Sequence, residues 1–270
     1  MKKSANNKKK VLITGGSSGL GYEISRHFAK DGYDLYWVAK SMEELASAKI
    51  QMQEEFANIE INILQINLTE SSAPKTVYDW ISEKVGSLDV LVNNAGFGTY
   101  GAFNETSMER EMEMIQVNVI GVYSLTKLFL KDMIKADHGK ILNISSGVSF
   151  NPVPRMSVYA GTKAFVRQMS ESISYELEYL KSKVTMTVVC PSAIKNTDFQ
   201  NQADMKNVAT FEGFFATTSE EVAKDAYEAM NLGKRLVLTG AKYRLGAKLT
   251  KVTPTFITQY AIKKEMERKS

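Results

Sequence analysis

The 270-residue sequence has little of what metal centres and disulfide frameworks require. It contains one cysteine, Cys190, which excludes an intramolecular disulfide and a cysteine-rich zinc site. The two histidines, His27 and His138, are too few for a histidine-based metal cluster, so no metal site is expected. Such sparse cysteine usage suits a reducing compartment, and we therefore expect a cytoplasmic location.

Long hydrophobic runs are also missing. No stretch of about 18 apolar residues occurs, so no transmembrane helix is expected. The basic N-terminus is similar to the start of a signal peptide, but only Val11, Leu12 and Ile13 follow before the glycines begin. An apolar signal segment is therefore not expected either.

Charge is unevenly distributed along the chain, whose net charge is +4. Residues 1–10 carry five lysines, and residues 242–270 carry eight Lys or Arg against two Glu, which leaves the body at −7. An acidic body argues against nucleic-acid binding by the core. The basic ends are most simply solvated tails, and the alternative is that the C-terminal segment contacts an anionic membrane surface as a peripheral protein does.

Short β-branched runs alternate with longer segments that carry apolar residues at helical spacing. Strands that read as continuous apolar runs are buried on both faces, which is typical of parallel sheets between helices. The expected strands are 11–14, 35–39, 61–66, 90–93, 140–145, 184–190 and 236–238, and the clearest helices are 111–135 and 157–180. We predict a single-domain, Rossmann-type doubly wound parallel α/β sheet of about seven strands. This catalytic domain would span residues 10–240, between a basic arm, 1–9, and a basic extension, 241–270.

The order and spacing of several motifs resemble the short-chain dehydrogenase/reductase family from about residue 10 to about residue 240. These motifs are Thr14–Gly21 (TGGSSGLG), Asn93–Gly96 (NNAG), Asn118, Ser146, and Tyr159 with Lys163 four positions later. The resemblance implies a single-domain enzyme that moves a hydride to or from a nicotinamide cofactor.

The glycine loop joins an expected strand to an expected helix. Glycines permit positive φ and let a ligand approach the backbone closely, and the helix N-terminus offers free N–H groups to a pyrophosphate. A tight turn also needs glycine, so the strand–loop–helix context carries the interpretation. Three residues separate Gly15 from Gly19, which is the spacing of the short-chain family. The cofactor-binding residues expected here are Gly15, Ser17, Ser18, Gly19, Leu20 and Gly21.

Lys40 follows the second expected strand and indicates the choice of cofactor. An Asp at this point would bind both ribose hydroxyls and select NAD, whereas a cation accommodates the 2′-phosphate of NADP. NADP(H) is therefore expected, and NAD(H) is the less favoured alternative. Ser18 stands where many NADP-using relatives carry a second basic residue, so the preference can be incomplete. The structural alternative is that Lys40 is only the solvated start of a helix.

The resemblance places the remaining cofactor contacts at the ends of three other strands. Asn67 stands where relatives usually have Asp bound to the adenine amino group, and an amide oxygen can accept the same hydrogen bond. After the sixth strand, relatives have a Thr that contacts the cofactor, and either Asn196 or Thr197 could take that role. The expected set is Asn67, Leu68, Asn94, Ala95, Gly96, Pro191, Ile194, Asn196 and Thr197, together with Tyr159 and Lys163.

Four residues form the expected catalytic set. Tyr159 and Lys163 share one face of a helix, and a nearby ammonium is expected to lower the pKa of the tyrosine from about 10. Ser146 ends the fifth strand, where its hydroxyl can bind the substrate oxygen. Ser145 is the neighbouring alternative, but the interval of thirteen residues to Tyr159 favours Ser146. By resemblance, Lys163 also binds the nicotinamide ribose, and Asn118 orders a water beside it for a proton relay.

The predicted function is that of an NADP-dependent oxidoreductase acting on a carbonyl or secondary alcohol. The substrate is expected to be an apolar small molecule, and the irregular stretch 198–219 is expected to act as a lid. Residues expected to line or cover its pocket are Phe97, Tyr100, Phe150, Pro152, Val153, Met156 and the phenylalanine-rich segment 199–215.

Two alternatives to this function stay open at the level of the sequence. The first is a non-catalytic NADP-binding sensor or scaffold, and the second is a membrane-associated lipid-modifying enzyme that uses the basic C-terminus. Each catalytic residue could also have a purely structural role when it is taken alone. Because relatives pair through the helices near 111–135 and 157–180, a homodimer or homotetramer is expected.

Overall fold

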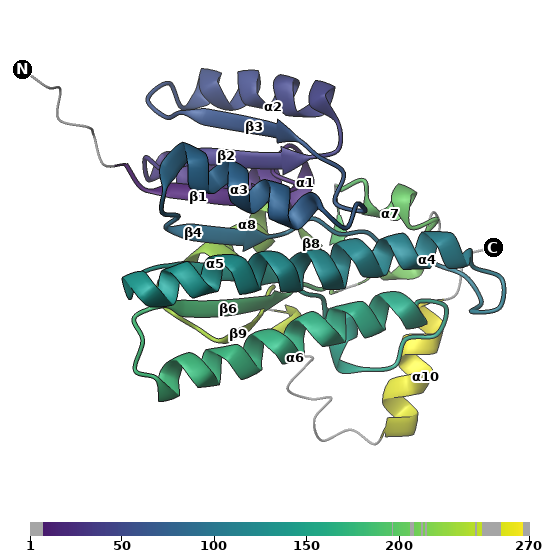
Figure 1. Cartoon of the computed structure of the whole chain (residues 1–270). Coiled ribbons are helices and arrows are strands. Elements are labelled where there is room, and N and C mark those ends of the chain that lie inside the picture. Colours follow the sequence, from purple (N-terminus) through teal and green to yellow (C-terminus); the bar gives the residue numbers. More distant parts are fainter. Residues whose placement is uncertain are drawn as a thin grey trace, which may run out of the picture.

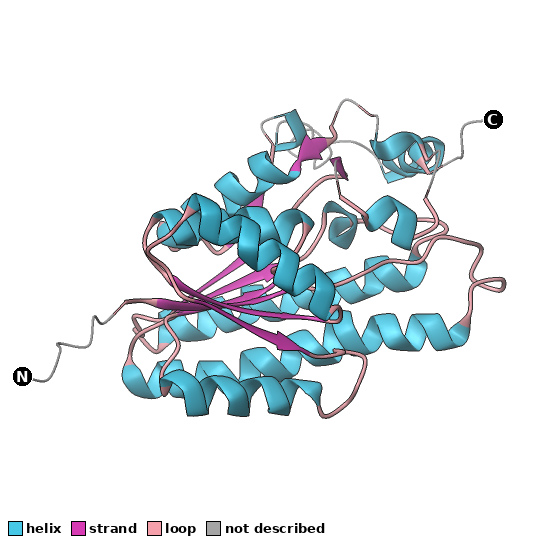
Figure 2. Ribbon diagram, turned by 90° about the horizontal axis from the view of Figure 1, so that it is seen from above, coloured by secondary structure: helices cyan, strands magenta, loops and turns pink. Residues whose placement is uncertain are grey.

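The centre of the molecule is a seven-stranded sheet with helices on both faces (Figures 1 and 2). The computed structural model describes residues 8–195, 197–205, 208–211, 213, 215–240, 242–244 and 255–266. The strand order is β3-β2-β1-β4-β5-β6-β9, and each neighbouring pair is parallel. The predicted doubly wound parallel sheet is therefore confirmed.

Each predicted strand lies within one residue of an observed one. The strands are β1 (Lys10–Thr14), β2 (Asp34–Ala39), β3 (Ile61–Gln65), β4 (Val90–Asn93), β5 (Lys140–Ile144), β6 (Thr185–Cys190) and β9 (Leu236–Leu238). The helices are α1 (Gly19–Lys30), α2 (Met42–Glu55), α3 (Ala73–Val85), α4 (Met108–Ile115), α5 (Val122–Ala136), α6 (Ser157–Tyr179), α7 (Phe199–Gln202), α8 (Ser219–Asn231) and α10 (Thr255–Glu265).

Two apolar cores, one on each face of the sheet, explain why the strands are continuous apolar runs. Successive side chains of a strand point to opposite faces. In β1, Leu12 belongs to one core, while Val11 and Ile13 belong to the other, and none of the three is exposed. Burial on both sides favours apolar residues at successive positions, so the strands read as largely apolar runs, which are interrupted by a few buried polar residues such as Asn143 and Thr187.

The strand order reverses direction at β1, and this reversal positions the site. From β1 the chain builds outward to β2 and β3, and then returns to place β4 on the other side of β1. In an open parallel sheet, such a switch point leaves a crevice at the carboxyl ends of the two central strands. The glycine loop after Thr14 and the segment after Asn93 meet there.

A single helical run covers residues 108–136, close to the predicted helix 111–135, but it is not α-helical throughout. A π-helical turn, Gln116–Gly121, separates α4 from α5 and contains Asn118. Such turns are rare and occur frequently at functional sites.

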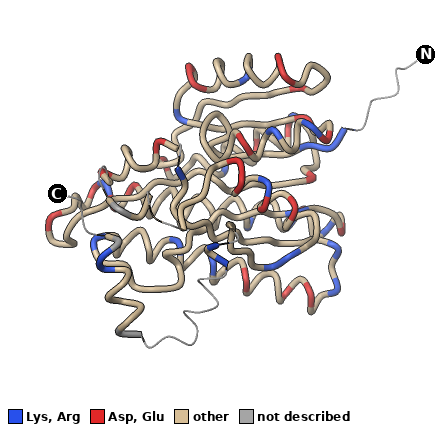
Figure 3. The backbone as a smooth tube through the Cα atoms, turned by 180° about the vertical axis from the view of Figure 1, so that it is seen from behind, with Lys and Arg blue, Asp and Glu red and all other residues tan. Residues whose placement is uncertain are grey.

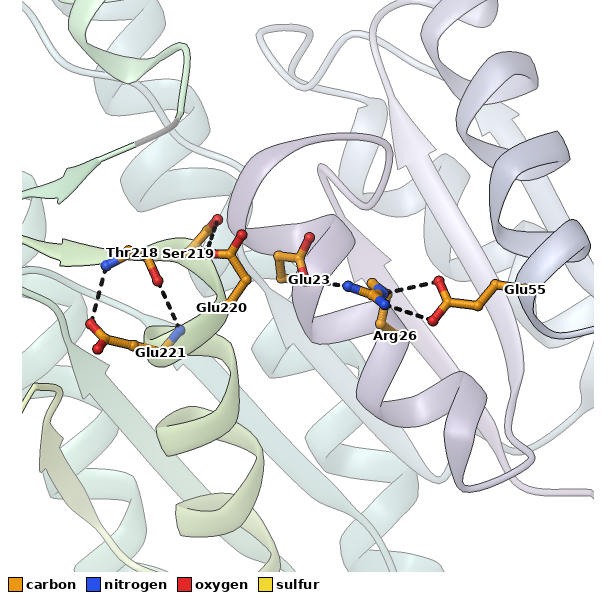
Figure 4. Close-up of polar contacts among 7 residues, drawn as sticks. All are labelled: Glu23, Arg26, Glu55, Thr218, Ser219, Glu220 and Glu221. Carbon is orange, nitrogen blue, oxygen red and sulfur yellow. Dashed lines mark hydrogen bonds and ion pairs between the residues drawn. The ribbon is translucent and has the colours of Figure 1, made fainter.

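The stretch 198–219, predicted to be irregular, contains short helical and strand elements and ends at the capped N-terminus of α8. It includes α7, a 3₁₀ turn (Ala209–Phe211) and β8 (Thr217–Thr218), which pairs with β7 (Ile194–Lys195). Thr218 and Glu221 form a reciprocal capping box at the start of α8, with hydrogen bonds of 3.3 and 3.4 Å (Figure 4).

Helix α1 is tied to the end of α2 by a charged cluster, which Figure 4 shows beside the α8 cap. Arg26 donates to the two carboxylate oxygens of Glu55 at 2.6 and 3.1 Å, and it also contacts Glu23 at 3.3 Å. This bidentate pair holds together the two helices that follow β1 and β2.

Part of the predicted basic extension packs on the preceding residues. Met266, just after α10, is 7% exposed, and its carbonyl accepts a hydrogen bond from the buried Tyr100 hydroxyl. In Figure 1, α7 and α10 lie on the side of the molecule toward which the strand arrows point. Figure 3 shows acidic and basic residues interspersed over the described helices. Among the described residues, no helix combines the length and the apolar character needed to cross a bilayer.

Candidate active site

A cavity of about 820 Å³ opens at the carboxyl ends of the central strands. It brings together most of the residues that the sequence predicted for catalysis and cofactor binding. Those on its wall are Gly15, Ser17, Ser18, Gly19, Leu20, Lys40, Asn67, Leu68, Asn94, Ala95, Gly96, Ser146, Tyr159, Lys163, Pro191, Ile194 and Thr197. Gly21 and Asn118 are not on this wall. Asn196 lies outside the described residues, so whether Asn196 or Thr197 contacts the cofactor stays open.

The glycine loop has the backbone conformation that the sequence predicted. Gly15 and Gly19 have φ values of +66° and +51°, which only glycine adopts without strain. The Gly15 N–H donates to the Val38 carbonyl at 2.8 Å and ties the loop to β2. Ser18 precedes α1 without a side-chain cap hydrogen bond, so the first N–H groups of the helix remain suited to an anion.

Gly21 also has a packing role, and its contact with the cofactor stays a prediction. It lies within α1, where a Cβ atom would stand 2.0 Å from the Gly15 carbonyl oxygen and 2.6 Å from Asn94 Nδ2. The missing side chain therefore lets the helix pack directly against the loop that precedes it.

Gly21→Ala should lower the free energy of unfolding by about 1–3 kcal/mol or more, because the added Cβ atom would clash with backbone that cannot rotate away. Gly161→Ala is the matched control: a Cβ atom at that position meets nothing within 4 Å, and Gly161 lies within α6. The control should keep or slightly raise the melting temperature, since alanine favours helix over glycine. Equal melting temperatures for Gly21→Ala and the unmodified protein would contradict the prediction.

Asn94 braces the glycine loop as well as lining the cavity. Its side-chain Nδ2 donates to the carbonyls of Thr14 (3.0 Å) and Gly15 (3.2 Å). The Thr14 hydroxyl in turn accepts the backbone N–H groups of Asn94 and Ala95, each at 2.9 Å. Sequence reasoning missed Thr14, whose only signal was a hydroxyl placed at the end of a buried strand.

Lys40 and Asn67 stand at the ends of β2 and β3. Lys40 is exposed and lines the cavity, and the helix after it starts at Ser41, whose side chain accepts the Glu44 N–H at 3.2 Å. Lys40 thus lies both near the start of α2 and on the cavity wall. The amide oxygen of Asn67 accepts the Thr69 N–H at 3.2 Å, which leaves its second lone pair for another donor.

Ser146, Tyr159 and Lys163 meet at one end of the cavity. The Ser146 side chain lies near enough to the Tyr159 hydroxyl to lower its pKa, and Lys163 Nζ lies 5.8 Å from the Tyr159 ring centroid. Lys163 donates to the Ile144 carbonyl at 3.0 Å, and only 5% of the residue is exposed. Ser145, the alternative, instead donates its hydroxyl to the Lys163 carbonyl at 2.8 Å and fixes α6 on β5.

The expected lowering of the tyrosine pKa is wrong for this structure. Burial raises the pKa of Tyr159 above its usual value, and the Ser146 side chain only partly opposes that shift. Burial also lowers the pKa of Lys163 to about 8. Desolvation therefore sets the direction of the Tyr159 shift, and the Lys163 ammonium is not among its causes. Tyr159 holds its proton at neutral pH and is suited to donate one.

Lys163 should make stability rise with pH in the alkaline range. Its folded pKa of about 8 lies below the unfolded value of about 10.4, so the unfolded chain binds more protons between these two values. Burying the ammonium costs stability fully below about pH 8, and the cost disappears as pH rises toward about 10.

Lys163→Met removes this titration. The stability advantage of the variant over the unmodified protein should therefore shrink by about 1–2 kcal/mol between about pH 7.5 and 9.5. Urea denaturation of both proteins across that range measures the difference. An advantage that stays constant with pH would show that Lys163 titrates alike in the folded and unfolded chains.

Asn118 is buried and makes all its visible contacts with protein. Its amide clamps the backbone of Phe97: Nδ2 donates to the carbonyl at 2.9 Å, and Oδ1 accepts the N–H at 3.2 Å. Nδ2 also contacts the Thr162 hydroxyl at 3.2 Å. The side chain thus holds the strand end against α6, which is the structural role that the sequence left open for it. The water relay stays a prediction.

Aromatic residues from the 198–219 stretch reach the catalytic end of the cavity. The Phe199 ring on α7 lies 5.4 Å from the Tyr159 ring and 6.4 Å from the Phe211 ring. Of the residues predicted to surround a substrate, Phe97, Met156, Phe199, Met205 and Phe211 line this cavity. Tyr100 is buried behind the wall, and Pro152 is exposed and does not line it. Phe214 lies outside the described residues.

Comparison with known proteins agrees with this geometry. The family model described as short chain dehydrogenase matches residues 9–207. An NADP-dependent 3-hydroxy acid dehydrogenase of Escherichia coli strain K12 is 29% identical over 219 residues, which cover 79% of this chain and 86% of that protein.

Two solved structures share the fold. A short-chain dehydrogenase from Sphingobium yanoikuyae in complex with NADPH has a TM-score of 0.77 and 26% identity, covering 91% of this chain and 96% of that one. An alcohol dehydrogenase from Thermococcus sibiricus complexed with 5-hydroxy-NADP has a TM-score of 0.74 and 25% identity, covering 87% and 97%.

Proposed function

Because the chain belongs to the short-chain dehydrogenase/reductase family, we propose that it transfers a hydride between NADP(H) and an apolar carbonyl or secondary alcohol. The observation that carries this proposal is the meeting of Tyr159, Ser146 and Lys163 at one end of a cavity whose other end carries the glycine loop and Lys40.

The residues present fit a dinucleotide. Gly15 and Gly19 line the cavity, and because they have no Cβ atoms a ligand could approach the loop backbone closely. The start of α1 lines the same cavity. Lys40 follows β2 and lines the same cavity, and a cation there would accommodate a 2′-phosphate, which supports NADP(H) over the less favoured NAD(H). The names of the Escherichia coli relative and of both solved complexes include NADP or a derivative of it.

Each catalytic side chain then has one proposed role. When bound, the nicotinamide supplies or accepts the hydride. In the reductive direction Tyr159 gives its proton to the carbonyl oxygen, and the Ser146 hydroxyl steadies that oxygen as its charge grows. Lys163, whose pKa of about 8 lies near neutrality, returns a proton to Tyr159. Asn118 is proposed to assist that return through ordered water.

A test of turnover decides between this enzyme and a non-catalytic NADP-binding sensor or scaffold. NADPH oxidation is followed by absorbance with a panel of aldehydes and ketones that differ in size and polarity. The proposal expects oxidation with at least some apolar members. NADPH binding without turnover across the whole panel would favour the sensor, which no observation supports so far.

We also propose that the chain forms a homodimer or homotetramer through the outer faces of α4, α5 and α6. These helices expose several large apolar side chains, including Met108 (66%), Met112 (60%), Tyr123 (47%) and Phe165 (42%). Analytical ultracentrifugation measures the state directly. Membrane contact by residues 241–270 stays a prediction, because much of that segment lies outside the described residues.

A further inference from the structure

A second cavity, of about 540 Å³, adjoins the catalytic one. Ser146 stands on the wall that the two cavities share, together with Val148 and Met266. The glycine loop, Lys40 and Asn67 line only the first cavity. Apart from Pro191, which lines both cavities, no described residue predicted to bind the cofactor lines the second cavity, although this cavity reaches Ser146. We call it the tail cavity.

The described wall of the tail cavity is largely apolar, and its polar side chains, which include Ser192 and Thr210, carry no charge. Val153, Leu238 and Ile262 contribute hydrocarbon, and Asn151 and Thr258 contribute neutral polar groups. The wall of the first cavity differs in this respect, since it includes Arg110, Glu113 and Asp198 beside the catalytic lysine. A charged group in the tail cavity would lose its hydration without gaining an ionic partner, which is strongly unfavourable.

Contacts between distant segments hold the roof of the tail cavity in place. Helix α10 supplies Ile257, Thr258, Ala261 and Ile262, and the hydrogen bond from Tyr100 to the Met266 carbonyl anchors its end. On the far side, the Phe215 and Tyr243 rings pack edge to face at 6.4 Å. The cavity is thus enclosed by α10 and by the segments that follow β5 and β6.

The rim of the tail cavity is apolar as well. Phe150, Phe215 and Ile257 line the cavity and are 38%, 37% and 46% exposed. These side chains come from three separate segments of the chain. An extended apolar group that entered beside Ser146 would therefore meet hydrocarbon along its length and again at the opening.

We propose that the tail cavity binds the neutral, elongated apolar tail of the substrate, whose carbonyl or hydroxyl group lies at Ser146 and Tyr159. This inference rests on the proposed function and narrows its substrate class to extended neutral ketones or secondary alcohols. Short hydroxy acids, and tails that end in a carboxylate, fit this cavity poorly because its described wall offers them no cation.

Reduction of a homologous series of methyl ketones, from five to eleven carbons, tests the substrate class. With saturating NADPH, kcat/KM should rise about twofold to fourfold for each added methylene, since a buried methylene contributes about 0.8 kcal/mol. 2-Octanone should exceed 7-oxooctanoate, the same chain ending in a carboxylate, by at least about tenfold. A kcat/KM that is independent of length, or equal for this pair, would overturn the inference while leaving the oxidoreductase proposal intact.

A matched pair of variants on α10 tests whether the dependence of kcat/KM on chain length arises in the tail cavity. Ile262→Trp adds bulk inside the tail cavity, whereas Lys263→Trp adds the same side chain to the exposed side of the helix. The ratio of kcat/KM for 2-undecanone to that for 2-pentanone should fall at least about tenfold in Ile262→Trp and stay unchanged in Lys263→Trp. An unchanged ratio in Ile262→Trp, in protein that still binds NADPH, would place the tail elsewhere.

Binding without turnover separates failure of the inference from failure of the proposed function. Calorimetric titration with 2-alkanols of the same lengths should show affinity that rises with length and is lost in Ile262→Trp. If no ketone is reduced but this binding pattern holds, the oxidoreductase proposal fails and the tail cavity stands. If short ketones are reduced and no alkanol binds more tightly with length, the tail cavity fails instead.

Discussion

Replacing Tyr159 with phenylalanine should lower kcat by about 10²–10⁴-fold, while NADPH still binds. The change removes the hydroxyl whose pKa Ser146 lowers, but it keeps the ring that packs against Phe199. Because burial holds the tyrosine pKa above its usual value, the native residue is a proton donor at neutral pH, and phenylalanine cannot replace that proton. Steady-state kinetics with one apolar ketone, and a separate NADPH titration, measure the two effects.

Tyr179→Phe is the matched control for this change. Tyr179 ends the same helix, α6, but it is 88% exposed and does not line the cavity. Loss of its hydroxyl should leave kcat within about twofold of the unmodified value, because exposed substitutions away from the site change little. Near-normal turnover in Tyr159→Phe would show that another group supplies the proton.

The native chain should bind NADPH at least about tenfold more tightly than NADH, and Lys40→Asp should invert that order. The ammonium can make charge-assisted hydrogen bonds to a 2′-phosphate but gains little from a hydroxyl. A carboxylate repels the phosphate and can accept bonds from both ribose hydroxyls. A hydrogen bond to a charged group contributes roughly 1.5–3 kcal/mol, which is about tenfold to a hundredfold in affinity. Fluorescence titration with each cofactor measures the order.

Lys84→Asp controls for the change in overall charge. Lys84 is exposed on α3 and does not line the cavity, so this variant alters the net charge equally without touching the cofactor site. It should keep the native preference for NADPH. Equal binding of NADH and NADPH by the unmodified protein would make Lys40 a solvated helix residue and remove the NADP assignment. The dehydrogenase family would be unaffected by that result.

The sheet could be predicted from the sequence because its inner strands are buried on both faces. Side chains such as Val11, Leu12 and Ile13 enter two different cores, so burial enforces an uninterrupted apolar run. The short pair β7–β8 was not predicted. Two residues on each strand leave too little pattern to detect, and their pairing depends on where the larger elements bring them.

Motif spacing predicted which residues meet at the site, but it did not predict how each is used. The meeting of Ser146 with Tyr159 follows from a strand end and a helix face. The hydrogen bonds of Asn118 to the Phe97 backbone depend on contacts between distant chain segments. The same is true of the hydrogen bond from the Asn94 amide to the Thr14 carbonyl before the glycine loop. The pKa of Tyr159 was predicted in the wrong direction, because desolvation depends on everything packed around a group rather than on its neighbours in sequence.

The hydrogen bond from Tyr100 to the Met266 carbonyl joins positions 166 residues apart, and it brings the end of α10 onto the body of the molecule. Most residues predicted to bind the dinucleotide come before β6, whereas α7 and α10, which line the cavities on the proposed substrate side, come after it. Helix α8 also follows β6, but it packs on α1, where the Tyr227 ring stacks on His27, so α7 and α10 are the segments free to vary. Grafting the segments that contain α7 and α10 from another family member should change the preferred carbonyl compound while the preference for NADPH is kept.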